Sequence, residues 1–258
     1  MKKIDLTSFS RVMFTGDIHG SFRPLVNDIC QNHGFENTLV VVCGDIGMGF
    51  YKRGYYTDEF RWMQNRLEKS GNALVMFRGN HDNPEYFNNV EYFELQYGGK
   101  YPNCFLVPDY TVLNTSKGGI LCIGGAVSID RSVRTEDVSW WRGEKFKLPS
   151  EELYSELSES DFSIVATHTC PQCCGPLFND AMGYENMDPD IMCELLYERL
   201  DLLEVFENLN KSGSIGLWVY GHFHGKYTDF VNGTKFVGLD MLRNSCADIY
   251  ELKDEQKH

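Results

Sequence analysis

The sequence predicts an α/β protein in which helices flank two β-sheets. Three observations carry this prediction. Apolar runs alternate with helical patterns over about the first 80 residues, which is the order expected of a parallel sheet. Short β-like segments separated by turns follow, and they predict a second, more antiparallel sheet. Each early apolar run ends in glycine and a polar residue, and functional sites form at such strand ends.

The first part of the chain alternates strands and helices. The expected strands are the apolar runs at residues 12–14, 39–43 and 73–77. A helix is expected at residues 22–30, where leucine, valine and isoleucine recur at helical spacing. The next helix covers residues 58–70, and Gly71 just beyond it is a typical stop. This part is therefore expected to fold as β-α-β-α-β.

The rest of the chain holds further strands and two helices. Residues 126–147 are polar and aromatic and are expected to form a loop. Ser150 can cap a short helix, and residues 189–209 form a long one that begins with Pro189. The expected strands are residues 104–107, 110–113, 119–123, 162–166, 215–220, 227–231, 234–239 and 248–252. Asn232-Gly233 predicts a hairpin between two of the last strands.

Length and composition narrow the class of protein. A chain of 258 residues suits a single domain over residues 1–258. The net charge of −13 argues against broad binding to nucleic acid or acidic membranes, because both need basic patches. Nine scattered cysteines without a secretory signal predict reduced thiols and a cytoplasmic location. The aliphatic runs are too short to span a bilayer, and nothing in the sequence indicates the oligomeric state.

Residues able to hold a metal follow five of the expected strands. They are Asp17, His19, Asp45, Asn80, His81, His168, His222 and His224. Any one of them alone would more often be an ordinary loop or core residue, but five of the seven histidines belong to this set. Mixed carboxylate, imidazole and amide ligands suit manganese, iron or zinc, with magnesium as an alternative. The sequence therefore predicts a site for divalent metal ions.

The order of these motifs resembles that of the calcineurin-like metallophosphoesterase superfamily. The resemblance rests on Gly16-Asp17-Ile18-His19-Gly20, Gly44-Asp45, Gly79-Asn80-His81-Asp82, His168 and Gly221-His222-Phe223-His224. It covers residues 12 to about 224. It implies a four-layer αββα sandwich, in which helices flank two mixed β-sheets, and a metal-dependent phosphoric ester hydrolase.

The resemblance also implies a role for each ligand. Asp17, His19 and His224 would hold one divalent ion. Asn80, His168 and His222 would hold a second, and Asp45 would bridge the two. A hydroxide between the ions would attack phosphorus directly, so that no phosphoenzyme is required. His81 would stabilise or protonate the leaving oxygen.

The second motif departs from the pattern of many relatives. They read Gly-Asp-x-x-Asp, followed by Arg in the serine/threonine protein phosphatases, whereas Met48 and Gly49 stand at those positions here. Asp82 then becomes the candidate for orienting His81. A serine/threonine protein phosphatase, with a phosphoprotein substrate, is the less favoured alternative. Arg78 would bind phosphate as in those phosphatases, or form a structural salt bridge.

Substrate contacts are also expected from the loop at residues 126–147. Arg131 and Arg134 could grip phosphate oxygens, and Trp140 or Trp141 could stack on a ring of the substrate. Alternatively, the tryptophans pack the loop and the arginines pair with nearby acidic residues. This segment is similar to that of bacterial and phage-borne members of the superfamily.

Together these features predict a phosphomonoesterase or phosphodiesterase that acts on a small phosphate ester. A catalytically silent scaffold with the same fold is the second alternative. Such a scaffold would be expected to have lost ligands, and every expected ligand is present.

Overall fold

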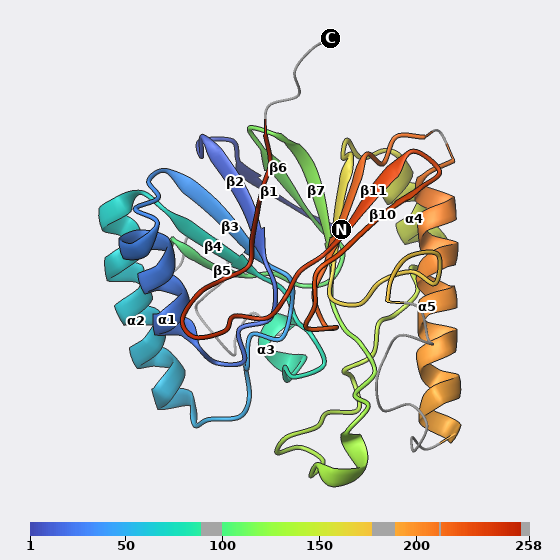
Figure 1. The fold of residues 1–258 in the computed structure, drawn as a ribbon, viewed down its shortest axis with the longest axis horizontal. Coiled ribbons are helices and arrows are strands. Elements are labelled where there is room, and N and C mark those ends of the chain that lie inside the picture. Colours follow the sequence, from blue (N-terminus) through green and yellow to red (C-terminus); the bar gives the residue numbers. More distant parts are fainter. Residues whose placement is uncertain (89–99, 177–188, 212, 254–258) are drawn as a thin grey trace.

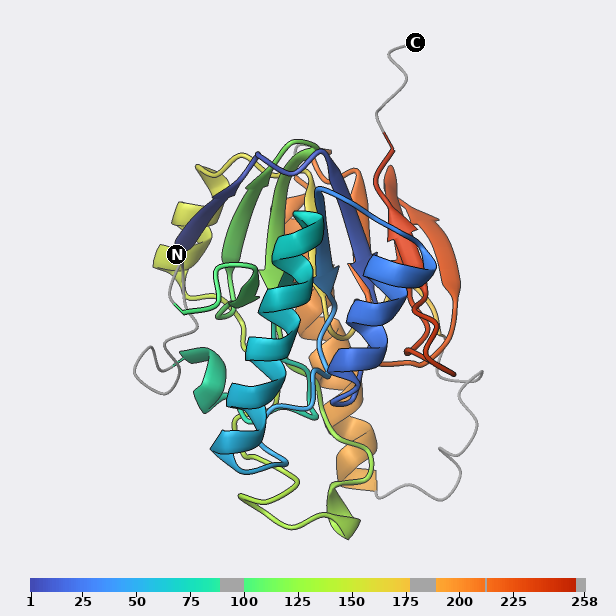
Figure 2. The same cartoon turned by 90° about the vertical axis from the view of Figure 1, so that its left-hand side faces the viewer.

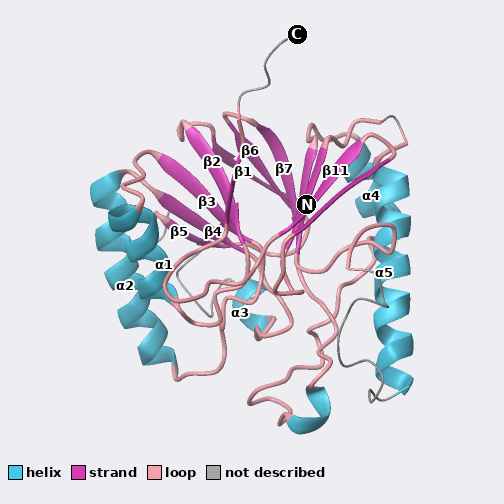
Figure 3. Cartoon of the chain, in the orientation of Figure 1, coloured by secondary structure: helices cyan, strands magenta, loops and turns pink. Residues whose placement is uncertain are grey.

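Two β-sheets lie face to face between two layers of helices in the computed structural model, which describes residues 1–88, 100–176, 189–211 and 213–253 (Figures 1 and 3). The five-stranded sheet has the order β12 (Ile249–Glu251), β2 (Arg11–Thr15), β3 (Thr38–Val42), β4 (Ala73–Met76) and β5 (Cys104–Leu106). The seven-stranded sheet has the order β1 (Lys2–Leu6), β6 (Thr111–Thr115), β7 (Gly118–Ile123), β8 (Ile164–Thr167), β9 (Leu217–Tyr220), β11 (Thr234–Gly238) and β10 (Tyr227–Val231). Both sheets are mixed, as expected.

Helices cover the outer face of each sheet. On the five-stranded sheet these are α1 (Phe22–Asn27), which continues into one π-helical turn, Asp28–Asn32, and α2 (Arg53–Ser70). Figure 2 places α1 and α2 side by side in front of this sheet. On the seven-stranded sheet they are α4 (Glu151–Ser158) and α5 (Pro189–Leu209). The four layers therefore follow the αββα order (Figure 1).

The central strands β3, β4, β8 and β9 are mostly apolar because both of their faces are buried. In β2, Val12 and Phe14 belong to the cluster between the sheets, whereas Met13 packs with the helices outside. Successive side chains of a strand point to opposite faces, so a continuous apolar run is what a middle layer requires. On the other sheet, Val165 and Trp218 face α5.

Several elements differ from the sequence-based expectation. The helix α2 begins at Arg53, five residues earlier than expected, although Lys52 before it makes no side-chain cap. The strand β1 and the four-residue helix α3 (Glu85–Asn88) are both additions, because each is too short to show a period. In the seven-stranded sheet two of the six described strand pairs are antiparallel, against one of four in the five-stranded sheet, so the second sheet is only slightly more antiparallel than the first.

Two general properties bear on the class of protein. All nine cysteines are free. Within the described ranges, every helix is too short or too polar to cross a bilayer.

Candidate metal centre

The predicted metal ligands meet at one edge of the two sheets. Asp17 follows β2, Asp45 follows β3, Asn80 follows β4, His168 follows β8, and His222 follows β9. These strands are parallel to their sequence neighbours within each sheet, so their carboxyl ends lie at the same edge. The two sheets thus bring residues far apart in the sequence to one place.

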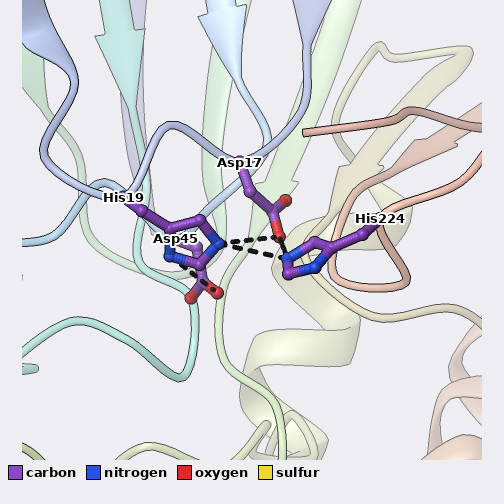
Figure 4. Close-up of side chains that lie close together, drawn as sticks. All are labelled: Asp17, His19, Asp45 and His224. Carbon is purple, nitrogen blue, oxygen red and sulfur yellow. Dashed lines mark hydrogen bonds and ion pairs between the residues drawn. The ribbon is translucent and has the colours of Figure 1, made fainter. Parts of the chain in front are cut away.

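The first donor set consists of Asp17, His19, Asp45 and His224, whose ligand atoms all lie within 4.8 Å of one another. Figure 4 shows the four side chains converging on one point. The Nε2 atom of His224 lies 2.9 Å from Oδ2 of Asp17 and 3.1 Å from Nε2 of His19. The Nδ1 atom of His19 lies 3.9 Å from Oδ2 of Asp45.

The second donor set lies on the other side of Asp45. Nε2 of His168 is 2.9 Å from Oδ1 of Asn80 and 3.2 Å from Oδ1 of Asp45. The ring of His222 lies 4.9 Å from that of His168, measured between centroids. One oxygen of Asp45 therefore faces the first set and the other oxygen faces the second.

The donor atoms fit divalent cations. Oδ2 of Asp17 is buried and faces two imidazoles, at 2.9 Å from Nε2 of His224 and 3.9 Å from Nε2 of His19. A buried carboxylate is costly unless positive charge neutralises it. Burial disfavours the imidazolium form of His168. The charge and hydrogen bond of Asp45, together with the charge of Asp17 and the hydrogen bond to the carbonyl of Cys43, outweigh burial and raise the pKa of His168 to about 10. The centre therefore attracts positive charge, and its oxygen and nitrogen donors suit first-row transition metals.

The backbone that presents these ligands is strained. His19, Asp45, His222 and His224 all have positive φ angles, of 44°, 48°, 69° and 48°. Residues other than glycine rarely adopt this left-handed conformation, which costs of order 1–3 kcal/mol each and is concentrated at functional sites. Ligands therefore come from sharp bends directly after the strands.

Glycines in the motifs leave room for these ligands. A Cβ atom on Gly79 would lie 2.1 Å from Oδ1 of Asp45, and one on Gly221 would lie 2.3 Å from Oδ1 of Asp17. Both contacts are too short for any side chain. The glycine of each motif is thus part of the metal centre's packing.

The amide of Asn80 is held by two buried residues outside the motifs. Its Nδ2 donates to Oγ of Ser128 at 3.0 Å, and that hydroxyl donates to Oε2 of Glu144 at 2.6 Å. The backbone N–H of Ser128 donates to the other oxygen of Glu144. This chain of hydrogen bonds directs Oδ1 of Asn80, the predicted metal-binding atom, toward His168. Neither Ser128 nor Glu144 belongs to a motif, so sequence spacing gave no signal for their role.

His81 lies on the open side of the centre. Its backbone N–H donates to Oδ1 of Asp45 at 2.7 Å, and its side chain is 27% exposed. Burial, and to a lesser degree the charge of Arg134, lowers the pKa of His81. Nη2 of Arg134 lies 3.0 Å from Nδ1 of His81 and also contacts Nε2 of the ring. His81 and Arg134 are therefore next to each other at the entrance.

Asp82 contacts backbone rather than the ring of His81. Its carboxylate accepts four backbone N–H groups, from Ile46, Gly47, Met48 and Gly79. These bonds join the loop after β3 to the loop after β4. Asp82 thus fixes the segment that carries His81, while the described contacts to the His81 ring include Arg134 and not Asp82.

All three of the predicted phosphate-binding arginines are engaged in ion pairs. Arg78 is 1% exposed, forms a two-pronged salt bridge with Asp109, and donates to three backbone carbonyls at residues 143–145. These contacts favour the structural alternative for Arg78. Arg131 forms a two-pronged pair with Glu194 of α5, an acidic residue distant in the sequence. Arg134 pairs with Asp130 at 2.7 Å, one of the partners expected from the sequence.

The departure in the second motif also has a structural counterpart. Met48 is fully buried in the cluster beneath α1 and α2. A Cβ atom on Gly49 would lie 2.7 Å from Cβ of Asn83 and 2.9 Å from the ring of Trp141. An arginine therefore has no room at position 49. Trp141 itself is 5% exposed, which favours its packing role over free stacking on a substrate.

Comparison with known proteins agrees with this geometry. The family model described as calcineurin-like phosphoesterase matches residues 10–226. No curated protein matches the chain. Among solved structures, phosphopantetheinyl hydrolase PptH from Mycobacterium tuberculosis is similar, with 15% identity, a TM-score of 0.52, and coverage of 96% of this chain and 98% of that one.

A serine/threonine protein phosphatase from Saccharomyces cerevisiae with similarity to human PP5 is also similar, at 12% identity and a TM-score of 0.38, covering 93% of this chain and 70% of that one. The similarity to PptH bears on the fold alone, the similarity to the yeast phosphatase carries no argument, and it is the family match that assigns the chain. Because that match spans most of the sequence and includes every motif at the metal centre, the chain belongs to the calcineurin-like phosphoesterase family and is a phosphoester hydrolase.

Proposed function

We propose that the protein hydrolyses small phosphate monoesters or diesters at a centre of two divalent metal ions. Asp17, His19 and His224 hold one ion, Asn80, His168 and His222 hold the other, and Asp45 bridges them. The observation that carries this proposal is the position of Asp45, whose two oxygens face the two donor sets separately. Two ions in such a site, when bound, polarise the phosphoryl oxygens and lower the pKa of water between them.

The chain's own residues would orient the ester and receive its leaving group. His81 lies beside Asp45 and is partly exposed, so its ring can donate a proton to the leaving oxygen. Arg134 contacts that ring and can bind a phosphoryl oxygen through its guanidinium group. Asp82 keeps the two loops in register through four backbone hydrogen bonds. Arg78 and Arg131 would then act by holding the loop at residues 126–147, Arg78 through the backbone carbonyls of residues 143–145 and Arg131 through Glu194 of α5.

A protein phosphatase and a silent scaffold are both less well supported. The packing of Gly49 leaves no room for the arginine of the protein phosphatases. A silent scaffold would not need four strained ligand positions around a shared carboxylate. Manganese, iron and zinc all suit the donors, so the native metal is best identified by reconstitution.

The test is hydrolysis of paired aryl phosphate monoesters and diesters by metal-stripped protein reloaded with manganese, iron, zinc or magnesium. We expect turnover with at least one metal. We also expect kcat/KM to fall by more than about a hundredfold in Asp45→Asn, because loss of a residue that only supports a ligand already costs about 10–100-fold and Asp45 is itself the proposed bridging ligand. The exposed Asp5→Asn substitution on β1 is the matched control and should leave kcat/KM unchanged. Equal rates for wild type and Asp45→Asn on every ester and metal would refute the proposal.

A further inference from the structure

A small pocket opens beside the candidate metal centre. Its volume is about 180 Å³, and it is lined by His19, Gly20, Gly47, Phe50, Tyr51 and His81. Two lining residues belong to the candidate metal centre: His19 is in the first donor set, and His81 lies beside Asp45. None of the six carries a carboxylate, so an anionic ester meets no negative charge from the lining itself. The pocket therefore lies where the organic part of a bound ester would extend.

Two aromatic rings form one side of this pocket. Phe50 is 38% exposed and Tyr51 is 54% exposed. The ring of Phe50 is nearly parallel to that of His81, at 23° and 6.2 Å between centroids, and meets Trp141 edge-on at 5.2 Å. The ring of Tyr51 packs on Tyr55 at 4.4 Å. Each ring thus has a fixed neighbour on one side and remains accessible on another.

The loop that carries these rings is held in place. The hydroxyl of Tyr56 is buried and donates to the carbonyl of Gly47 at 2.8 Å. It also accepts the N–H groups of Gly49 at 2.8 Å and Tyr51 at 3.1 Å. The Tyr56 hydroxyl thus donates one hydrogen bond and accepts two, and these three bonds fix the backbone on both sides of Phe50. The exposure of the two rings is therefore built into the fold, and pre-positioned groups of this kind reduce the ordering cost of binding.

We infer that this pocket binds a planar ring of the substrate, with the phosphoryl group at the adjacent metal centre. This inference rests on the proposed function and adds a substrate class to it: phosphoesters that carry an aromatic ring, either an aryl group or a nucleobase. A cavity of about 150 Å³ accepts benzene, so the pocket has room for one such ring. Phe50 and Tyr51 then act as specificity-determining residues, because aromatic faces favour a planar ring over a puckered one of equal size.

The experiment measures binding of phosphonates, which cannot be hydrolysed, so that leaving-group chemistry does not enter. Calorimetry on protein loaded with the metal that supports turnover compares phenylphosphonate, cyclohexylphosphonate and inorganic phosphate. We expect phenylphosphonate to bind about threefold to tenfold more tightly than cyclohexylphosphonate, the preference typical of aromatic pairs. Adenosine 5′-methylenephosphonate is the second arm and distinguishes a nucleobase from a directly attached aryl ring.

Variants connect this preference to the two rings. Phe50→Leu keeps an apolar side chain without a planar face, and Tyr51→Ala removes the second ring. Each single variant should reduce the preference for the ring-bearing phosphonate over cyclohexylphosphonate, and the double variant should abolish it. The affinity for inorganic phosphate should stay within about twofold of wild type in all three variants. Phe230→Ala, which removes an aromatic residue that is 74% exposed on the edge strand β10, is the control and should change nothing. Thermal unfolding of each variant checks that it is folded.

The outcomes separate the two proposals. If inorganic phosphate binds and esters are hydrolysed, but neither ring-bearing phosphonate is preferred over cyclohexylphosphonate, the ring pocket is refuted and the proposed function stands. A preference that survives in the double variant also refutes it. If the metal-loaded protein neither binds phosphate nor hydrolyses any ester, both proposals fail together.

Discussion

Ser128 and Glu144 determine which atom of the Asn80 amide faces the metal centre. An amide can rotate by 180° and present nitrogen in place of oxygen, and only the oxygen is a ligand. The hydroxyl of Ser128 accepts the N–H of Asn80 and in turn donates to Glu144, so the rotated amide would lose its partner. All three residues are buried, where an unpaired polar group costs about 1–3 kcal/mol.

Removing the Ser128 hydroxyl should therefore weaken one of the two metal sites. In Ser128→Ala we expect the affinity for the ion at Asn80, His168 and His222 to fall roughly 10–100-fold, which is typical when a residue that supports a ligand is lost. The ion at Asp17, His19 and His224 should be less affected. Titration of metal-stripped protein with manganese, followed by electron paramagnetic resonance, measures the two sites separately. Ser128→Thr keeps the hydroxyl and should restore binding. Two unchanged affinities in Ser128→Ala would contradict this role.

The clustering of the candidate ligands could be predicted from the sequence, whereas their supports could not. Asp17, Asp45 and His168 each follow an apolar strand, and strand ends in a parallel sheet meet at one edge. Glu144 lies 16 residues from Ser128 in a segment without regular structure, so no period connects them. The sequence left two roles open for Arg78, phosphate binding and a structural salt bridge. Only its burial and its pairing with Asp109, which the sequence does not show, favour the structural role.

At the level of elements, α5 anchors the loop at residues 126–147. Two glutamates one helical turn apart, Glu194 and Glu198, face that loop. Glu194 pairs with Arg131 and Lys145. Glu198 is buried and accepts the backbone N–H groups of Val127 and Phe146. This helix thus holds the loop that contributes Ser128 to the metal centre.

The buried carboxyl of Glu198 should make folding stability depend on pH. Burial raises the pKa of Glu198 to about 7 from an ordinary 4.5, although the hydrogen bonds from the backbone of Val127 and Phe146 oppose the shift. The folded state therefore keeps a proton that the unfolded chain releases within this window. The contribution of Glu198 to the free energy of unfolding falls as pH rises from about 4.5 to about 7, by up to roughly 3 kcal/mol.

Glu198→Gln mimics the protonated acid and removes this dependence. Chemical denaturation at several pH values, at constant metal concentration, should give a variant that gains stability relative to wild type as pH rises from about 5 to about 7.5. The gain should approach zero at the acid end, apart from a constant offset. A difference between the two proteins that does not change with pH would contradict this expectation.

Element boundaries were harder to predict than element types. The expected helix at residues 22–30 is interrupted because the chain changes from α1 to a π-helical turn at Asp28. Apolar spacing does not distinguish these two hydrogen-bond patterns. The strand β1 was missed because Lys2–Leu6 has only two buried apolar residues, and its pairing with β6 depends on a partner more than a hundred residues away.

Across the whole molecule, the metal centre joins the two sheets. Asp17, Asp45 and Asn80 come from the five-stranded sheet, while His168 and His222 come from the seven-stranded sheet. Without cations, buried carboxylates and closely spaced imidazoles are left to face one another. Bound metal ions should therefore stabilise the packing of one sheet on the other as well as support catalysis.

Metal removal should lower the stability of the entire fold. Ligand at a hundred times its dissociation constant adds about 2.7 kcal/mol to the free energy of unfolding at one site. We expect stripped protein to unfold at a midpoint several degrees below that of reloaded protein, as measured by thermal denaturation. Asp45→Asn should show a much smaller difference between the two states. A wild-type midpoint that is insensitive to metal would contradict this expectation.

The C-terminal segment has a consequence for biosynthesis. β12 pairs with β2, and the N–H of Leu242 donates to the carbonyl of Asp17, so the first metal-binding loop receives contacts from the end of the described chain. His222, whose N–H also donates to Asp17, is translated 205 residues after it. At about 5–20 residues per second, a ribosome needs roughly 10–40 s to cover that interval. During this time the nascent chain exposes an incomplete donor set, so the proposed metal ions would be acquired only after His222 and His224 have been synthesised.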